Sequence, residues 1–406
     1  MKRTLKLTAV LLCVILVGSA LCACGLKSFE NDLRYRYDYD LTDYLKPGKY
    51  KGLEVYVGKT DVSEEEISNA AKRNSVLGCE WTDIYDRACA EGDVVGVSYQ
   101  GYRRGESGEF DEPIEALSKG FRLGEPADTP EALSESSATT LPIVLGTDEL
   151  FPGFEDQIIG AFSAGDRKKL TYTVPEPCWE FPELAGEEIQ MDVLLTYIQE
   201  IKYPENDDEM AQNSGFGSME DYKLSLGSKL ITNRTERVDA YVHSRVWAQI
   251  NDAFTVKKYP EKELAETVSA IKESYEQRAE QLDHTLDEYI SEHLGLTKEA
   301  FEARTEKEAK DTVKDEMIVY YIARKEQIGV SNLDFEDKVE EMMEQGEFTD
   351  VDQYVRYIAY YNGYAAESEA LTEEMLEHAR NFLKENILYG MVDDFIDENT
   401  SRKAER

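Results

Sequence analysis

Proline is almost absent from the second half of this 406-residue chain. Ten of its eleven prolines lie at or before Pro204, only Pro260 follows, and residues 261–406 contain none. Proline interrupts helices because it has no amide proton and its ring clashes with the preceding turn. Its absence from a Glu- and Lys-rich sequence predicts a mostly helical C-terminal part. No heptad pattern is sustained there, which argues against a long coiled coil.

Cysteine and histidine are also scarce. Beyond residue 24 the chain has only Cys79, Cys89 and Cys178, too few and too irregularly spaced for a disulfide framework or a zinc site. Two interpretations of Cys79 and Cys89 are open: a disulfide bridge, or free thiols that act as small apolar residues. The four histidines have no metal-binding spacing, and neither a phosphate-binding glycine loop nor a Gly-x-Ser-x-Gly turn occurs. We expect no metal and no other cofactor.

Basic residues are scarce relative to acidic ones. The chain has 45 Lys and Arg against 83 Asp and Glu, a formal net charge of −38. Proteins that bind nucleic acid need basic residues to displace counterions from phosphates. The charge therefore argues against nucleic acid and the ribosome surface as partners. Acidic residues spread along the whole chain instead favour solubility and repulsion between copies.

The N-terminal apolar run, residues 7–21, is too short for a comfortable membrane span and follows a basic stretch, as in signal peptides. It ends in Leu21-Cys22-Ala23-Cys24, which resembles a bacterial lipobox. The resemblance implies a signal peptide over residues 1–23, lipidation of Cys24, and anchoring at the extracytoplasmic face of the membrane. Ordinary cleavage and an uncleaved anchor are the alternatives.

The rest of the chain divides into segments that differ in residue composition and pattern. Residues 24–46 are polar and rich in Tyr and Asp, which indicates a tether or, alternatively, a binding strip. Residues 48–59 alternate like a strand, and Ser63 opens a capping box before a short helix. Further helix starts are indicated at Ser218, Thr349 and Thr372. Between residues 92 and 203, β-branched and aromatic runs separated by Gly/Pro turns predict an antiparallel sheet, with strands at 94–102, 141–145, 169–174 and 189–201.

Several of these segments resemble, in the same order, the FKBP-type peptidyl-prolyl isomerase domain. They are Gly92–Gly101, Phe110-Asp111, Leu145-Gly146, Leu150–Gly160, Gly165-Asp166, Lys169–Glu176 and Leu184-Ala185-Gly186. The Phe-Pro-Gly-Phe-Glu form and the Leu-Ala-Gly ending are closer to trigger factor than to free-standing FKBPs. In the C-terminal part, Asn206–Ala211, Gly217–Tyr222 and Ile387–Ile396 resemble the entry and the last helix of the trigger-factor chaperone domain.

The resemblance implies an α+β multidomain fold, in which an FKBP-like antiparallel β-sheet with a short helix precedes an all-α chaperone domain. The expected organisation is a signal peptide (1–23), a tether (24–46), a strand–helix lead-in (47–90), an isomerase domain (91–203) and a helical domain (204–400). We expect residues 205–400 to fold independently. The basic ribosome-docking domain of trigger factor has no counterpart here, so ribosome docking is not carried over. The stretch 112–140 is longer than in the family and is expected to be a surface loop.

The resemblance also implies the site residues. Tyr99, Phe110, Asp111 and Phe154 correspond to catalytic positions, with Asp111 either orienting Tyr99 or bracing the loop before the insertion. Substrate-binding positions are Ile143, Leu150, Phe151, Trp179 and Met191. Trp179 stands near the place of an aromatic residue at the pocket rim. Taken in isolation, Phe154 and Met191 are better explained as core residues.

Isomerisation requires no nucleophile or metal, because the enzyme only has to bind the twisted amide better than the planar one. The resemblance implies a prolyl isomerase and ATP-independent chaperone that assists unfolded or newly exported polypeptides with X–Pro bonds. One alternative is a holdase whose FKBP-like domain is an inactive scaffold. Another is a lipoprotein receptor or adhesion scaffold with no role in folding.

The lipobox-like motif makes a direct prediction. Cells fed a fatty-acid analogue should label the wild-type chain but not Cys24→Ser, because the thioether at Cys24 carries the lipid. Equal labelling of both chains would contradict lipidation. Label lost only in Cys22→Ser would move the site to that residue.

Overall fold

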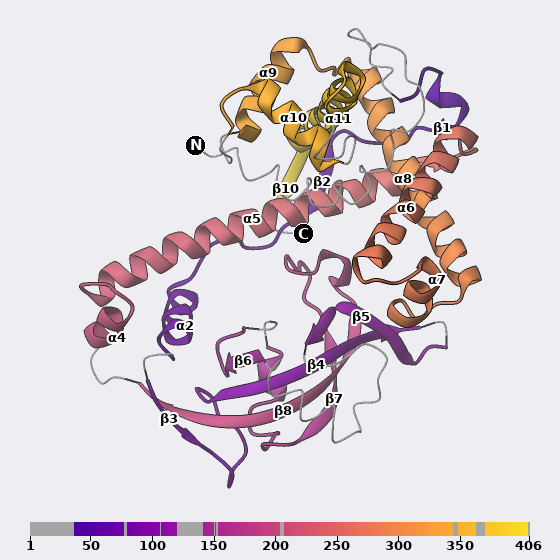
Figure 1. The fold of residues 1–406 in the computed structure, drawn as a ribbon. Coiled ribbons are helices and arrows are strands. Elements are labelled where there is room, and N and C mark those ends of the chain that lie inside the picture. Colours follow the sequence, from indigo (N-terminus) through magenta and orange to yellow (C-terminus); the bar gives the residue numbers. More distant parts are fainter. Residues whose placement is uncertain are drawn as a thin grey trace. The chain divides into compact units, whose positions relative to one another are not determined.

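The computed structural model describes residues 36–76, 79–105, 107–119, 141–149, 151, 153–203, 207–343, 348–362 and 370–404. The chain forms two compact units (Figure 1). The first contains the chain up to Val55 and residues Val242–Arg402, and the second contains Tyr56–Tyr241 with the last residues from Lys403 on. The boundary lies within the long helix α5 (Met219–Ala253) rather than at residue 204.

An antiparallel sheet forms the centre of the second unit. Strands β4 (Val94–Arg104) and β8 (Glu188–Lys202) pair along most of β4. The other edge of β8 pairs with β3 (Glu80–Asp83) and β7 (Arg167–Thr173), and the other edge of β4 pairs with β5 (Phe110–Lys119) and β6 (Leu141–Val144). The predicted antiparallel sheet is confirmed, and its four predicted strands lie within three residues of the observed ones.

Residues 112–119 form part of a strand, although a surface loop was expected there. They belong to β5 and pair with β4, with irregular register at two places. Pro113 is tolerated because β5 lies at the edge of the sheet, where a missing amide proton breaks no ladder bond. The remainder of the insertion, residues 120–140, lies outside the described residues.

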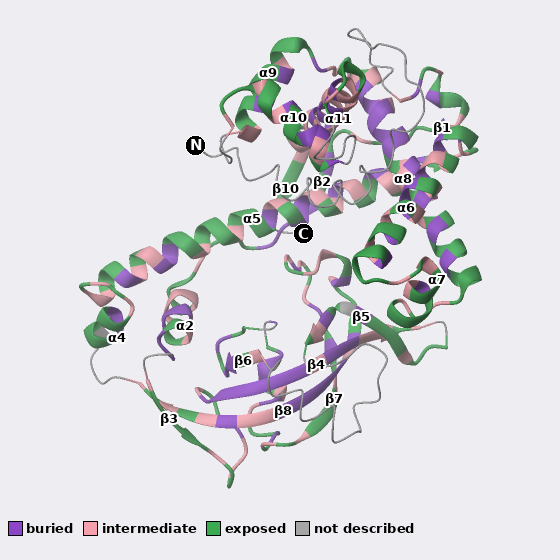
Figure 2. Ribbon diagram, viewed as in Figure 1, coloured by how far each residue is buried: buried purple, intermediate pink, exposed green. Residues whose placement is uncertain are grey.

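The core of the second unit lies against the sheet. Residues of β4 and β8 are buried (Figure 2). Each of the short 3₁₀ helices, Glu155–Gln157 and Pro182–Leu184, adds one buried residue, Glu155 and Leu184. Cys89 and Cys178 are buried free thiols of this core, and Cys79 is also free. The bridge between Cys79 and Cys89 is therefore absent, and the free-thiol interpretation is confirmed.

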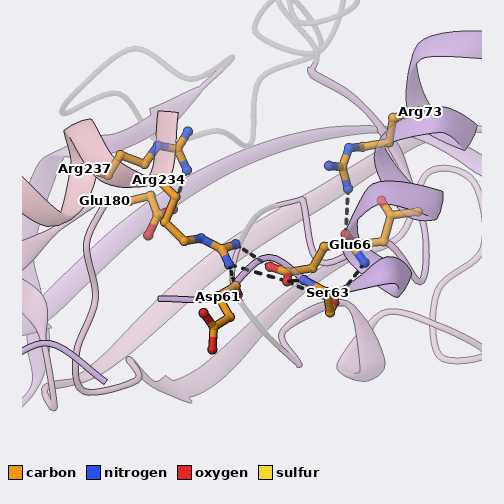
Figure 3. A network of polar contacts seen from close by, with 8 residues as sticks. Asp61, Ser63, Glu66, Arg73, Glu180, Arg234 and Arg237 are labelled. Carbon is orange, nitrogen blue, oxygen red and sulfur yellow. Dashed lines mark hydrogen bonds and ion pairs between the residues drawn. The ribbon is translucent and has the colours of Figure 1, made fainter. Parts of the chain in front are cut away.

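Three helical pieces complete the second unit: α2 (Glu64–Ser75), α4 (Asp207–Asn213) and the first half of α5. The predicted capping box is present, since Ser63 and Glu66 exchange side-chain and backbone hydrogen bonds. Figure 3 shows the polar contacts between α5 and other residues of the second unit. Arg234 donates to the Asp61 carbonyl at 2.7 Å and pairs with Glu66, and Arg237 pairs with Glu180 at 2.5 Å.

The first unit is mostly helical, as the lack of proline predicts. Its helices are α6 (Glu261–Gln281), α7 (Leu286–Glu288), the π-helix η5 (Tyr289–His293), α8 (Lys298–Glu326), α9 (Asn332–Met343), α10 (Val351–Tyr361) and α11 (Glu373–Glu398). Thr372 caps α11 as predicted, whereas Asp350 rather than Thr349 caps α10. Short strands complete the unit: β1 (Leu45–Lys46) pairs with β9 (Thr255–Val256), and β2 (Leu53–Tyr56) pairs with β10 (Thr400–Lys403).

The predicted tether is wrong for residues 36–46, because they are packed into the first unit. Tyr37 is 0% exposed, and Leu41, which begins the 3₁₀ helix η1 (Leu41–Asp43), and Leu45 are buried as well. Arg324 of α8 donates to the backbone carbonyls of Tyr37 and Tyr39. Residues 24–35 lie outside the described residues.

A buried ion pair fixes the start of this segment. Arg36 lies 3.0 Å from Glu316 of α8, and both side chains are only 11% exposed. The guanidinium also donates to Thr267 of α6 at 3.1 Å, and the Tyr37 hydroxyl donates to Glu316 at 2.9 Å. Burial raises the pKa of Glu316, and Arg36 partly opposes that rise. Because the N-terminal segment completes the helical core, residues 205–400 do not make up a compact unit.

No helix in the described part of the chain combines the length and apolar character needed to cross a membrane.

Arg36→Met tests how far the helices depend on this segment. Removing one partner of a buried pair leaves an uncompensated charge, so unfolding of the first unit should become easier by about 3–5 kcal/mol. The control is Lys51→Met, because the pair of Lys51 with Glu326 is more exposed and should contribute about 0–1 kcal/mol. Urea titration followed by far-UV circular dichroism measures both changes. Equal losses would show that the buried pair has no special part in the fold.

Candidate functional site

Four aromatic rings form a cluster on the second unit. Phe151 contacts Phe154, Tyr172 and Phe181, with ring centroids 6.3, 5.5 and 5.6 Å apart, and Phe154 lies 5.3 Å from Tyr172. Phe151 is 3% exposed and Phe154 is 0% exposed. Desolvation raises the pKa of the Tyr172 phenol to about 12. The cluster is a water-poor aromatic environment.

A single carboxylate shapes the turn that leads into this cluster. Glu155 is 1% exposed, and its two oxygens accept backbone hydrogen bonds from Gly146 (2.7 Å), Thr147 (3.0 Å), Asp148 (3.2 Å) and Glu149 (2.6 Å). Gly146 and Asp148 have positive φ angles of 83° and 52°. Four converging amide protons need an acceptor when they are buried, and Glu155 supplies it. The rings of Phe151 and Phe154 are therefore placed by the same residue that closes the turn.

The sheet brings three more predicted residues to this core. Ile143 and Met191 are buried in it, and Tyr99 packs against it with a pKa raised by burial. Gly101 faces Met191 across the two central strands. A β-carbon at Gly101 would lie 2.8 Å from the Leu117 side chain and 3.3 Å from the Met191 sulfur, so glycine allows the close approach.

Two predicted catalytic residues lie elsewhere. Phe110 begins β5 opposite Arg104, whose guanidinium lies 4.1 Å from the ring centroid. Asp111 is exposed and accepts a hydrogen bond from the Ser107 hydroxyl at 2.8 Å. Tyr99 is five residues from Arg104 on β4, which is roughly 16 Å along a strand. Of the two roles considered for Asp111, bracing the hairpin turn agrees with this position, and orienting Tyr99 does not.

The contacts that hold Trp179 in place are with residues outside the aromatic cluster. Its indole donates to the Val57 carbonyl at 3.1 Å, and the Arg234 guanidinium lies 5.2 Å from its ring. Phe181, two residues later, is the side chain that reaches Phe151. The aromatic residue that joins the cluster from this stretch is therefore Phe181 and not the expected Trp179. Leu150 and Cys24 lie outside the described residues.

Sequence reasoning missed Tyr172, Phe181 and Glu155. Tyr172 alternates with Leu170 and Val174 in a predicted strand, so its inward direction was available from the pattern. Phe181 follows an irregular Pro-rich stretch without periodicity. Glu155 gives no signal at all, because a buried Glu is rare and is identified only by the four amides that surround it.

The arrangement offers packing and backbone hydrogen bonding rather than proton transfer. Within the described ranges, no three His, Cys, Asp or Glu side chains gather to hold a metal ion. Asp192, a buried acid of β8, accepts two hydrogen bonds from Arg167 at 2.9 and 2.7 Å. The site chemistry supported by these groups is the binding of an apolar group against aromatic rings.

Comparison with known proteins shows a similarity to the trigger factors. Residues 218–379 match the family model of the bacterial trigger factor protein C-terminus. The trigger factor of Macrococcus caseolyticus is 28% identical over 300 residues, covering 73% of this chain and 64% of that protein. The trigger factor of Caldicellulosiruptor saccharolyticus is 24% identical over 366 residues, covering 89% of this chain and 73% of that protein. The chain therefore spans about two thirds to three quarters of the length of these relatives.

A solved trigger factor chaperone, described for promiscuous substrate recognition in folding and assembly, is 14% identical. The alignment covers 87% of this chain and 73% of that one, with a TM-score of 0.32. A score this low does not establish a shared arrangement of the whole chain.

Glu155→Gln tests the role of the buried carboxylate. The amide keeps one acceptor oxygen but turns an NH₂ group toward amide protons, so the second unit should lose about 1–3 kcal/mol of stability. Differential scanning calorimetry measures the change. Glu80→Gln, an exposed position on β3, is the matched control and should stay within about 0.5 kcal/mol of the wild type. A neutral Glu155→Gln would mean that the turn forms without its acceptor.

Proposed function

Because this chain is related to the trigger factors, we propose that it is a protein-folding factor that holds unfolded polypeptide without ATP and accelerates cis/trans exchange at X–Pro bonds. The lipobox-like motif supports an extension of this proposal. The protein would act on newly exported chains from the extracytoplasmic face of the membrane, to which Cys24 would anchor it.

The exposed apolar side chains carry the chaperone proposal. Eight large hydrophobic residues are exposed in the described structure, and six of them fall within the region that matches the family model: Leu224, Ile231, Leu282, Leu333, Tyr357 and Tyr361. Apolar groups on a strongly charged surface lose contact with water when they bind apolar segments of another chain. Several separated contacts of this kind favour weak, exchangeable binding of unfolded chains.

The aromatic cluster supports the isomerase proposal. Rotation about a peptide bond has a barrier of about 18–20 kcal/mol, because the twisted amide loses its resonance and its charge separation. A water-poor aromatic surface destabilises the polar planar amide relative to the twisted one. In this proposal the proline ring packs against Phe154, and the Tyr99 hydroxyl orients the peptide.

A specific observation favours a second candidate, the non-catalytic holdase. Phe154 is fully buried by its own unit, and Phe110 and Asp111 lie at the turn of the β4–β5 hairpin, outside the buried core that contains Phe154. A domain whose aromatic residues serve only as core would show the same burial. In this alternative the second unit is a scaffold, and the exposed residues on the helices do all the binding.

The chaperone proposal is tested on the full chain held in lipid nanodiscs. It should slow aggregation of a chemically denatured test protein in a stoichiometric manner, without ATP, because binding covers apolar surface on the client. The double variant Leu224→Ser/Ile231→Ser should protect less. The control is Lys223→Ser, a neighbour on the same helix. No protection at a several-fold excess over the client, measured by light scattering, would contradict the proposal.

The isomerase proposal is tested with a short X–Pro peptide, which reports on the second unit alone. Phe154→Ala should lose most of the acceleration. Tyr99→Phe should lose up to about tenfold, since one net hydrogen bond contributes about 0.5–1.5 kcal/mol. The rate should be flat across neutral pH because no step transfers a proton. No acceleration by the wild type would favour the holdase, and a bell-shaped pH profile would exclude this mechanism.

A further inference from the structure

Two segments of the first unit contain lysines and no acidic residue. They are residues 44–53 and 253–260, and their lysines are Lys46, Lys49, Lys51, Lys257 and Lys258. Asp and Glu make up 83 of the 406 residues, about one in five. Stretches whose only charges are positive are therefore unusual in this chain.

The fold joins these two segments, which are far apart in the sequence. β1 pairs with β9, and the amide of Lys257 donates to the Tyr44 carbonyl at 2.7 Å. A β-carbon on Gly48 would overlap the Ala253 carbonyl, so glycine allows the two backbones to approach closely. The lysines of both segments are thereby brought to one region of the first unit.

Four of these lysine side chains have no acidic partner within ion-pair distance among the described residues. The Lys257 ammonium donates to the Thr42 carbonyl at 2.6 Å, and Lys49 also donates to a backbone carbonyl, at 2.8 Å. The Lys258 ammonium lies 4.4 Å from the centroid of the Tyr44 ring. These four exposed side chains, called the lysine patch below, are Lys46, Lys49, Lys257 and Lys258.

The acids near the patch leave the region positive. Lys51 pairs with Glu326 at 2.5 Å, which brings the end of α8 next to the two segments. Hydrogen bonds from Thr42 lower the pKa of Asp40, and Lys257 contributes to the same shift, so Asp40 lies near the patch as well. With these neighbours included, residues 40–53, 252–262 and 324–326 contain eight basic and five acidic residues. The region is positive in a chain whose net charge is −38.

A positive region on a negative protein can act at short range. At physiological salt the Debye length is about 8 Å, so charges on other faces are screened from a partner that touches the patch. Anionic lipid headgroups attract lysines that lie next to them. The long aliphatic stems of lysine also let the ammonium groups reach toward a flat surface.

The place of the patch in the chain favours a membrane as the partner. Twelve positions separate Cys24 from Arg36, the first described residue, and an extended chain of that length spans at most about 40 Å. A lipid on Cys24 would hold the first unit near the bilayer at a high effective concentration. One attachment point does not decide which face of the unit turns to the bilayer, whereas a charged surface does.

We propose that the lysine patch docks the first unit on the anionic phosphate headgroups of the membrane to which the chain is anchored. This inference rests on the membrane anchoring in the proposed function, and it adds the orientation. The face formed by β1 and β9 turns to the bilayer. A lipid chain and a basic patch together give the two signals that stable membrane attachment needs.

The test maps lysine acetylation by mass spectrometry on the full chain in nanodiscs of phosphatidylglycerol or of phosphatidylcholine. The four patch lysines should react at least about threefold more slowly on phosphatidylglycerol, because its headgroups cover the ammonium groups. Lys298 and Lys307, exposed residues of α8, are controls and should react equally on both lipids. Salt at about 1 M shortens the Debye length to about 3 Å and should remove the difference.

A double variant tests whether the lysines act together. Lys46→Gln/Lys49→Gln removes two of the four charges, so Lys257 and Lys258 should react on phosphatidylglycerol nearly as fast as on phosphatidylcholine. The matched control, Lys298→Gln/Lys307→Gln, removes the same charge from α8 and should leave the protection of the patch unchanged.

Equal reactivity of the patch on both lipids, or protection that persists at high salt, would overturn the inference. Soluble glycerol phosphate or poly-glutamate is added to the phosphatidylcholine samples. Protection by either would assign the patch to free phosphate or to acidic polypeptide and would also overturn it. Protection that grows with protein concentration would indicate a second copy, with the same consequence.

Anchoring is measured separately on the same samples. A chain that stays on both kinds of nanodisc without protection of the patch would contradict the docking alone. Protection without fatty-acid label at Cys24 would contradict lipidation and leave the docking intact. A chain retained on neither kind of nanodisc would contradict both.

Discussion

The helices of the first unit close around a segment from the other end of the chain. The Tyr37 hydroxyl bonds to Glu316, 279 positions later, and Arg36 makes the only ion pair found for Glu316 among the described residues. Without that segment, the inward faces of α6 and α8 would present Thr267 and Glu316 to an incomplete core. Polar groups buried without partners are costly, so the helical unit depends on a contact that its own helices cannot supply. This is why the chain up to Val55 belongs to the helical unit. The first half of α5 belongs to the second unit instead, where Arg234 pairs with Glu66 and Arg237 pairs with Glu180.

The second unit depends in a similar way on one buried acid. Glu155 collects four backbone amides, and the turn that it stabilises carries Phe151 and Phe154 into the aromatic cluster. The strands β4 and β8 add Tyr99 and Met191 to the same core. The paired strands and the charge-assisted hydrogen bonds to Glu155 hold these side chains in place.

The helices and the sheet core suggest a division of labour in the proposed function. Most exposed apolar residues fall in the part that matches the trigger factor C-terminus, where weak contacts with unfolded chains would form. The core of the second unit holds Phe151, Phe154 and Tyr172 in a closed cluster, where a single proline ring would be bound against them. Strong negative charge disfavours association between copies, which would leave the exposed aromatic residues available to clients.

The sequence by itself determined the local structure. Proline distribution separated sheet from helix, and alternation located β4, β6, β7 and β8. The capping signals at Ser63 and Thr372 marked the starts of α2 and α11. These features depend on neighbours within a few positions, so one sequence is enough to read them. The family resemblance implied one pocket lined by Tyr99, Ile143, Phe151, Phe154 and Met191, and these residues lie in or against a single core of the second unit.

Only the tertiary structure decided the long-range contacts. It packed residues 36–46 into the helices, turned residues 112–119 into β5 and placed Asp111 at the hairpin rather than beside Tyr99. It also brought Phe181, and not Trp179, into contact with Phe151. The physical reason is the same in each case. A polar or aromatic side chain takes its position from partners far away in the sequence, and the local pattern carries no record of them.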